Sequence, residues 1–475
     1  MSVGRISLSL VLAGALAACG SDGGGPTFGS APTPAPTSAA PTPTPSTASC
    51  SLSDRKAWVL DQLQTYYLFP DLLDANIDPA PFATVQDYIN ALVAPARALG
   101  RDRGFTYLTS IEAEQELINS GSSAGFGIRL IYDTVNSRVF IAESFEGAPA
   151  YPQGFDRGTE ILSVGGTSTA DLFAAGGAQA FSDALGPSDP GVTRTFTIRQ
   201  PDNSQSTVTV TKAEYALDPI SDRYGALVID NNGTKVGYIN LRTFIVADAG
   251  PQLRTAIDGF RQQGITEVIL DFRYNGGGLV DVAELLGDLL GGDKVGQLFS
   301  RTEFRPSLNS NSTENFEAQP EAIAATKIAL IGTSATASAS ELTGNAFIPY
   351  LGNNTALVGS NTYGKPVGQI ARDRAACDDR LRVMAFRTVN ADGDGDYYTG
   401  LASVFPRTCA ATDDFLDQFG SKAEASTAAA LNFLDGGTCS LIIASGSQRA
   451  LSRPRLQTLP ARAPTAAQYQ IPGLY

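Results

Sequence analysis

Between residues 234 and 405 the sequence alternates between strand-like and helical patterns, and this alternation constrains the fold more than any other feature. Apolar runs typical of strands occupy 235–241, 267–272 and 327–331, and helical patterns occupy 249–262, 280–290 and 338–347. Alternation of this kind predicts an α/β layer with a largely parallel sheet.

The sequence changes character on either side of this core. Short β-rich runs separated by turn residues fill 121–213, and helical patterns dominate 50–118. A chain of 475 residues is long enough for several domains. We therefore predict a multidomain α/β protein, with a helical N-terminal region at 50–118, a β-rich domain at 121–213, an α/β core at 214–438 and a tail at 439–475. Within the core, we expect a mobile flap at 303–325 and helices at 412–419 and 422–434.

The first 49 residues have the composition of a targeting segment and a linker. Arg5 precedes an apolar run at 6–18 that is too short to span a bilayer, which needs roughly 20 residues. The run ends in Leu16-Ala17-Ala18-Cys19-Gly20, which resembles the lipobox of bacterial lipoproteins and implies lipidation of Cys19. An ordinary secretory signal is the alternative. Residues 20–49, rich in Pro, Ser and Thr, predict a disordered tether. The expected location is the bacterial cell envelope, facing the periplasm and anchored by lipid, with Gly20 favouring the outer membrane.

Charge and cysteine content limit the partners and the compartment. With 34 Lys and Arg against 48 Asp and Glu and no basic stripe, nucleic acid is not an expected partner, and the only expected membrane contact is the lipid anchor. Besides Cys19, the chain has Cys50, Cys377, Cys409 and Cys439, and four cysteines in an exported protein predict two disulfides. Of the three connectivities we favour one that pairs Cys377 with Cys409. The alternative, a zinc site, lacks both CxxC pairs and histidine.

The chain contains no histidine, so a serine nucleophile would need a carboxylate or a lysine as its base. Small residues surround Ser338 in the stretch 333–341, where Ser334 and Ser340 are rival candidates. Lys365 is the candidate base, and to be neutral at working pH its pKa must fall to about 7–8 through burial. The loop Asn275-Gly276-Gly277-Gly278 can offer backbone amides to an oxyanion. A phosphate site is the alternative, but the nucleotide-binding glycine motifs are absent there.

The β-rich domain carries a second glycine motif. Gly125-Phe126-Gly127-Ile128, followed by the runs at 147–150 and 154–166, resembles a PDZ domain of the bacterial protease type. The resemblance implies that these four residues form a carboxylate-binding loop, in which successive amides converge on an anion and the adjacent strand edge pairs with an extended peptide. By itself the glycine motif is a weak signal and favours a simple β-turn.

Three ordered motifs together resemble the C-terminal processing peptidases, also called tail-specific proteases, over residues 50–435. They are the run at 271–278, Ser338-Ala339-Ser340-Glu341, and Tyr363-Gly364-Lys365 with Gln369. The resemblance implies a peptidase without cofactor or metal that cuts unfolded or tail-exposed proteins. It assigns the nucleophile to Ser338, the general base to Lys365, the orientation of the lysine to Gln369 and the oxyanion donors to Gly277 and Ala339. The chain departs from the family pattern at Gly276, at Pro366 and in the connection at 349–355.

Two other functions remain as alternatives. A lipid-tethered PDZ scaffold without catalysis would bind peptide tails but would need none of the three catalytic side chains. A Ser/Lys acylase of cell-wall substrates would need a lysine where Glu341 stands. The run at 390–396 resembles the start of a calcium loop, but Leu401 occupies the position of its last ligand, which favours a solvated turn.

Overall fold

A six-stranded sheet forms the centre of the α/β core in the computed structural model, which describes residues 49–443, 456–459, 461 and 464–475. The strand order is β10-β11-β12-β15-β16-β19. Only β10 runs antiparallel to its neighbour, so the predicted parallel sheet is confirmed. The strands are β10 (Ala226–Asn231), β11 (Thr234–Asn240), β12 (Glu267–Asp271), β15 (Lys327–Gly332), β16 (Thr355–Gly359) and β19 (Thr408–Ala410).

Helices cover both faces of this sheet. Alternate strand residues point to opposite faces, so Leu270 packs with one set of helices while Ile269 packs with the other. One face is covered by α6 (Ala249–Arg261), α7 (Val280–Leu290) and α8 (Ala339–Leu351), the other by α9 (Ala425–Leu434). Burial on both faces explains why these strands are continuous apolar runs in the sequence.

A second sheet joins the N-terminal helices to the core. Its order is β1-β18-β13-β14, and β17 also pairs with β18. The strands are β1 (Tyr107–Ser110), β13 (Leu298–Phe304), β14 (Ser312–Asn315), β17 (Val367–Arg374) and β18 (Asp379–Val389). The apolar faces of α1 (Leu52–Tyr66) and α2 (Val85–Leu92) pack on β17 and β18, and α3 (Ala94–Ala98) and α4 (Ile111–Ser120) complete the helical region. The flap predicted at 303–325 is therefore partly wrong, because β14 pairs with β13 in this sheet.

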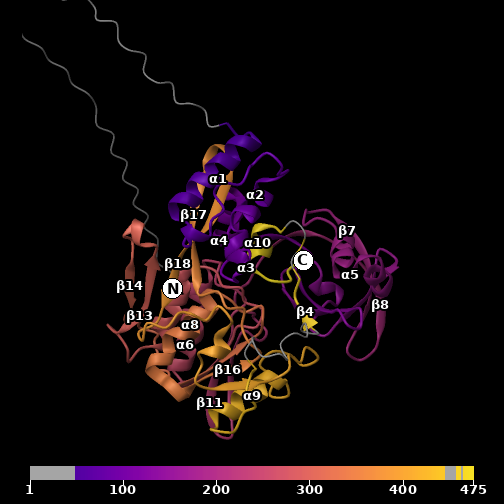
Figure 1. The fold of residues 1–475 in the computed structure, drawn as a ribbon. Helices are drawn as coiled ribbons and strands as arrows, with labels where there is room; N and C mark the ends of the chain where they lie inside the picture. The colour runs from indigo at the N-terminus through magenta and orange to yellow at the C-terminus, as the bar shows by residue number, and fades with distance from the viewer. Residues whose placement is uncertain (1–48, 444–455, 460, 462–463) are drawn as a thin grey trace, which may run out of the picture. The chain divides into compact units, whose positions relative to one another are not determined.

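The β-rich region is built on a third sheet, ordered β20-β3-β4-β5-β7-β8 with β6 beside β5. Its helix α5 (Thr169–Leu185) was not predicted, and it packs Phe181 and Leu185 against the sheet. The fold class predicted from the sequence is thus confirmed, with a helical region, a β-rich region and an α/β core (Figure 1). The strands are β3 (Ile128–Asp133), β4 (Arg138–Ser144), β5 (Glu160–Val164), β6 (Thr167–Ser168), β7 (Thr193–Arg199), β8 (Gln205–Thr211) and β20 (Leu456–Gln457), while β2 (Ser122–Gly125) pairs separately with β9 (Ala213–Ala216).

The prediction of two disulfides is confirmed, but the favoured pairing is wrong. Cys50 bonds to Cys377 and Cys409 bonds to Cys439. Cys377 lies in the turn between β17 and β18, where Arg374 donates to the carbonyl of Ser49 and holds the start of α1 close. Cys409 lies in β19 of the central sheet, whereas Cys377 lies in a turn of the second sheet, so the favoured pair belongs to two different parts of the fold.

The helix predicted at 412–419 is also wrong. The segment has no helical turn of its own, because its polar groups bind two buried arginines instead. Asp413 pairs with Arg157 and Arg273, and the carbonyls of Asp414 and Asp417 accept from Arg157. The second predicted helix of this part, at 422–434, is present as α9.

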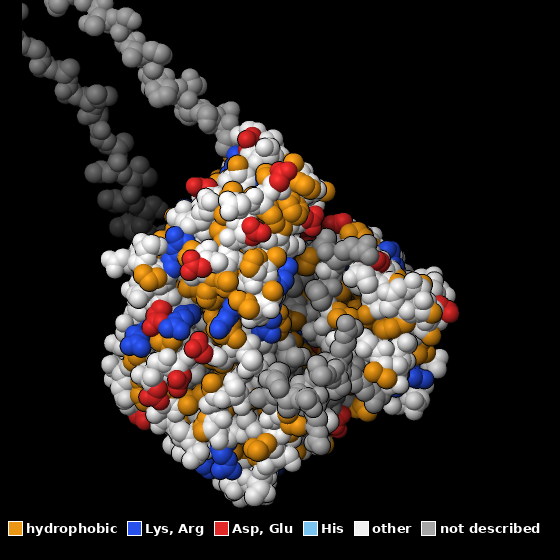
Figure 2. All heavy atoms as spheres, in the orientation of Figure 1, with side chains coloured by type: hydrophobic (Ala, Val, Ile, Leu, Met, Phe, Trp, Pro, Cys, Tyr) orange, Lys and Arg blue, Asp and Glu red, His pale blue; other side chains and the backbone are white. Residues whose placement is uncertain are grey.

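Several predictions about the chain as a whole remain open. Cys19 and nearly all of the linker predicted at 20–49 lie outside the described residues. The described residues form one compact unit, so the domain boundaries within it stay predictions. No helix among the described residues has both the length and the apolarity needed to cross a bilayer. On the face drawn in Figure 2, acidic and basic side chains are interspersed over the described surface.

Candidate active site

Ser338 lies where the chain leaves the end of β15 and enters α8, and its backbone is strained. Its φ of 57° and ψ of −117° fall outside the regions that a residue with a side chain normally adopts. A serine on a sharp strand-to-helix turn is typical of an exposed nucleophile. The structure also separates the rival serines, because Ser340 is fully buried with its hydroxyl on the carbonyl of Asn275, whereas Ser334 is exposed.

Lys365 follows the strand next to β15 and carries an amine that is only partly accessible. The amine donates to Gln369 Oε1 at 2.9 Å and lies 5.0 Å from the centre of the Phe105 ring. Gln369 in turn donates to the carbonyl of Phe105, which fixes the orientation of its amide. Burial of the amine lowers the pKa of Lys365 to about 8; Arg382 acts in the same direction, and Asp102 and Glu341 oppose the change. The amine is therefore substantially neutral in mildly alkaline solution.

A buried carboxylate connects the serine to the lysine. Glu341, in the first turn of α8, accepts the amides of Ser338 at 3.1 Å, Gly364 at 2.7 Å and Lys365 at 2.7 Å. Its burial raises the pKa of Glu341, and the hydrogen bonds that it accepts oppose the rise. Sequence reasoning missed this role, although an acidic residue three positions after a helix-capping serine is a recognisable pattern.

The glycine loop lies directly against the serine. A Cβ atom on Gly277 would come within 2.7 Å of Ser338 Cβ and 3.0 Å of the Ala339 nitrogen, so only glycine permits this approach. Ala339 begins α8, where amides lack partners within the helix. The structure therefore brings Gly277 and Ala339 together beside Ser338. The Gly277 amide, however, donates to Asn275 Oδ1 at 2.9 Å.

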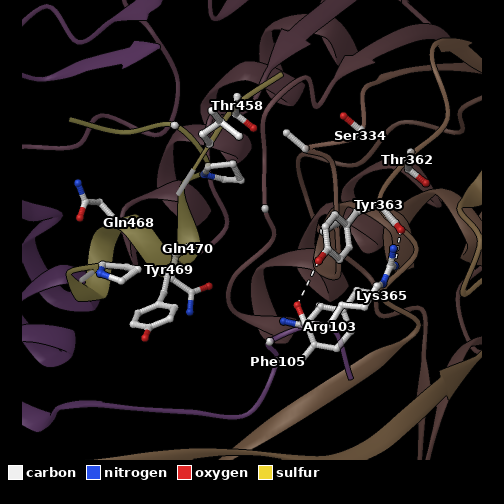
Figure 3. A pocket seen from close by; sticks show the side chains of 18 of the residues that line it. Arg103, Phe105, Ser334, Thr362, Tyr363, Lys365, Thr458, Gln468, Tyr469 and Gln470 are labelled. Atoms are coloured by element: carbon white, nitrogen blue, oxygen red, sulfur yellow. Dashed lines mark hydrogen bonds between the residues drawn. The ribbon is translucent and has the colours of Figure 1, made fainter. Parts of the chain in front are cut away.

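A cavity of about 730 Å³ opens beside these groups. Lys365 and Gln470 line it from opposite sides (Figure 3), and Gly276, Ala337 and Pro472 also line it. Within the described chain, no hydrogen bond joins the Lys365 amine to Ser338 Oγ. Such bonds in free enzymes are often long and shorten only when substrate binds.

The loop at 102–106 shapes the surroundings of the lysine, and no sequence pattern pointed to it. Asp102 is fully buried and accepts from the Tyr67 hydroxyl at 2.9 Å, the Phe105 amide at 2.8 Å and the Thr106 hydroxyl at 2.7 Å. Arg103 donates to the carbonyl of Gly364 at 2.6 Å. The N-terminal region therefore positions both the ring and the carbonyl that contact the lysine and its glutamine.

The second glycine motif lies away from the serine, in the β-rich region. Gly125 ends β2, Phe126 is buried, and Gly127 adopts a φ of 74° before β3 begins at Ile128. The amides of Gly127 and Ile128 converge on one oxygen of Tyr475, at 3.0 and 3.1 Å. The geometry is that of a small anion-binding loop.

The acidic run at 390–396 closes as a turn. Asn390 Oδ1 accepts the amides of Asp392 at 3.1 Å and Asp394 at 3.0 Å. Among the described residues, no group of three or more His, Cys, Asp or Glu side chains is arranged to hold a metal ion.

An α/β core that presents a strained serine at a helix N-terminus, near a lysine of lowered pKa, is typical of serine hydrolases that use lysine as the base. Comparison with known proteins indicates a peptidase. Residues 235–397 match the model of peptidase family S41. The carboxyl-terminal-processing protease of Picosynechococcus sp. is 29% identical over 252 residues, which are 52% of this chain and 55% of that protein. The protease of the same name from Synechocystis sp. is 27% identical over 273 residues, or 56% of this chain and 58% of that protein.

A solved structure agrees with the fold. The crystal structure of a Bacteroides fragilis protein assigned to the S41 proteases superposes with a TM-score of 0.61 at 23% identity, covering 80% of this chain and 97% of that one. Residues 235–397 thus resemble peptidase family S41, and about half of the chain is similar to carboxyl-terminal-processing proteases. The chain spans little more than half the length of the curated relatives that it matches.

Proposed function

We propose that this protein is a serine endopeptidase that cleaves unfolded or tail-exposed proteins through an acyl-enzyme. The observation that carries the proposal is the environment of Lys365. Its amine donates to Gln369 and has a pKa lowered to about 8. The backbone amides of Lys365 and Ser338 both donate to the carboxylate of Glu341. A chain without histidine needs such a base.

The proposed reaction is acyl transfer from a peptide to Ser338. Neutral Lys365 removes the proton from Ser338 Oγ, which attacks the peptide carbonyl, and the charged lysine then protonates the leaving amine. Water, activated by the same amine, hydrolyses the ester. Amides of Gly277 and Ala339 stabilise the oxyanion, and each such donor typically contributes roughly 10²–10³ in rate. Since Asn275 holds the Gly277 amide, that contact must open as the substrate binds.

The substrate side of the proposal rests on the β-rich region. Gly125, Phe126, Gly127 and Ile128 would bind the carboxylate of a substrate tail, while the edge of β3 that faces away from β4 would pair with its backbone as in a PDZ domain. We place the enzyme in the bacterial cell envelope, anchored by a lipid on Cys19 and facing the periplasm. The lipobox-like sequence supports this location.

Labelling with a serine-directed acylating probe tests the chemistry. The wild-type chain should be labelled, Ser338→Ala should not be, and Lys365→Ala should be labelled at least roughly 10²-fold more slowly. Ser334→Ala is the matched control, because this serine is exposed near the same cavity, and it should be labelled like the wild type. A wild-type chain that resists the probe but binds peptide tails would instead support the scaffold alternative.

A further inference from the structure

The last part of the described chain binds along the edge strand of the β-rich region. We call residues 456–459 and 464–475 the tail segment. Its strand β20 pairs antiparallel with β3, with Gln457 opposite Tyr132. Further on, the Leu130 amide donates to the carbonyl of Gly473 at 2.9 Å, and the Tyr475 amide donates to the carbonyl of Ile128 at 2.8 Å. The tail segment therefore occupies the edge where an added peptide strand would pair.

Tyr475 fills the rest of the peptide site. One of its oxygens accepts the converging amides of Gly127 and Ile128, as described above. Tyr475 is 4% exposed, and its ring packs in the hydrophobic core between β3 and α5. The ring hydroxyl is 2.9 Å from Ser182 Oγ and also donates to the carbonyl of Leu459. Both the backbone and the side chain of Tyr475 are thus bound as the final residue of a peptide would be.

The middle of the tail segment lies against the glycine loop at 275–278. A Cβ atom on Gly276 would come within 2.5 Å of the Gln470 carbonyl oxygen. Tyr469 stacks on Tyr107 with ring centres 3.9 Å apart, and Gln470 donates to the Tyr107 hydroxyl at 2.7 Å. Figure 3 shows Gln468, Tyr469 and Gln470 across the cavity from Lys365.

We infer that the tail segment is an intramolecular ligand of the peptide site. Two consequences follow. The site selects peptides whose last residue is aromatic, because its pocket encloses a tyrosine ring and contacts the hydroxyl. The tail segment must also leave before such a peptide can bind, and while bound it covers the cavity of Lys365. The inference about selection deepens the proposed function and rests on it in one respect, because it takes the bound peptide to be the tail of a substrate that Ser338 then cleaves.

Tethering makes the tail segment a strong competitor. A ligand joined to its own site by a short chain has an effective concentration of about a millimolar. A free peptide with the same contacts therefore binds poorly until the tethered one is weakened. Weakening the tail segment should strengthen the binding of a free peptide, the opposite of what damage to the site itself would do.

The first experiment measures selection. A fluorescent peptide with the sequence of residues 471–475 and a free carboxylate is titrated onto the full chain carrying Ser338→Ala, which prevents cleavage, and Tyr475→Ala, which weakens the tail segment. The same peptide with an alanine at its end, and the amidated peptide, should each bind at least about tenfold more weakly. Equal binding of all three peptides would overturn the aromatic and carboxylate selection.

The second experiment measures competition. On the Ser338→Ala background, adding Tyr475→Ala should strengthen binding of the free peptide about tenfold or more. Val135→Ala, in the exposed β3–β4 turn, is the matched control and should change nothing. Tyr469→Ala leaves the Tyr475 ring in place and should strengthen binding of the free peptide to a smaller degree. It replaces Tyr475→Ala in the experiment if that variant has a much lower melting temperature than the parent chain. Unchanged or weaker binding in both folded variants would contradict the inference.

These measurements are independent of hydrolysis. If the wild-type chain fails to react with the acylating probe but the peptide results hold, the proposed peptidase function is wrong and the intramolecular ligand stands. If the chain cleaves proteins and neither tail variant changes peptide binding, the proposed peptidase function stands and the intramolecular ligand is wrong.

Discussion

At the level of single residues, the proposed chemistry depends on the charge of one amine. The pKa of Lys365 is about 8 because burial disfavours the charged form. A charged lysine cannot accept the proton of Ser338, so the proposed mechanism predicts that activity is lost as pH falls below this value. We expect kcat/KM to rise with pH to a plateau, with a midpoint near 8. A profile that is flat between pH 6 and 9 would contradict lysine as the base.

The partner of the amine offers a sharper test of the same point. Replacing Gln369 by Glu places a carboxylate beside the ammonium and should raise the pKa of Lys365 by about one to three units, because an opposite charge stabilises the charged form. The pH–rate profile should therefore move to higher pH, and kcat/KM at pH 7 should fall roughly tenfold or more. Gln369→Met removes the hydrogen bond without adding charge, so it should lower the plateau without an alkaline shift. Identical profiles for the two variants would contradict the argument.

At the level of elements, Glu341 fixes the position of α8 relative to the loop before β17. Three amides from two segments share its two oxygens, and a glutamine offers only one oxygen to them. Glu341→Gln should lower kcat about tenfold or more, with a smaller change in KM, because the serine and the lysine lose their mutual placement. It should also lower the midpoint of the pH profile, since the charge of Glu341 raises the pKa of Lys365.

A change in the pH midpoint separates this positioning role from a general loss of stability. Glu112→Gln, at an exposed position in the first turn of α4, is the matched control and should leave both kcat and the midpoint unchanged. A loss of kcat in Glu341→Gln with an unchanged midpoint would leave Glu341 with a structural role only.

Patterns that are local in sequence were predictable, and contacts across the chain were not. The strands of the central sheet are buried on both faces, so their apolar runs identify them. Ser338, Lys365 and Gln369 stand in compact motifs, and the structure places the last two in contact. Asp102 and Phe105 act on Lys365 from more than 250 residues away, and the docking of Tyr475 depends on a few residues without periodicity. Neither leaves a pattern that a single sequence can show.

At the level of the whole molecule, the Cys50–Cys377 disulfide fastens the N-terminal helices to the strands that follow Lys365. It closes a loop of 327 residues, whereas Cys409–Cys439 closes one of 30. In the chain-entropy model, loops of these lengths correspond to about 6 and about 4 kcal/mol of stabilisation. The first disulfide also holds α1 to the turn of the β17–β18 hairpin, whose strand β17 carries Gln369.

Removing each disulfide by paired Cys→Ser substitution should therefore give different results. The Cys50/Cys377 double variant should melt at a lower temperature than the Cys409/Cys439 double variant, and it should lose more activity, because the loop at 102–106 and the β17–β18 hairpin would separate more readily. Thermal melting and acylating-probe labelling of both variants, in parallel with the wild type, measure the two effects. The larger loss in the Cys409/Cys439 variant would mean that the central sheet, rather than the junction with the N-terminal helices, is what limits the integrity of the site.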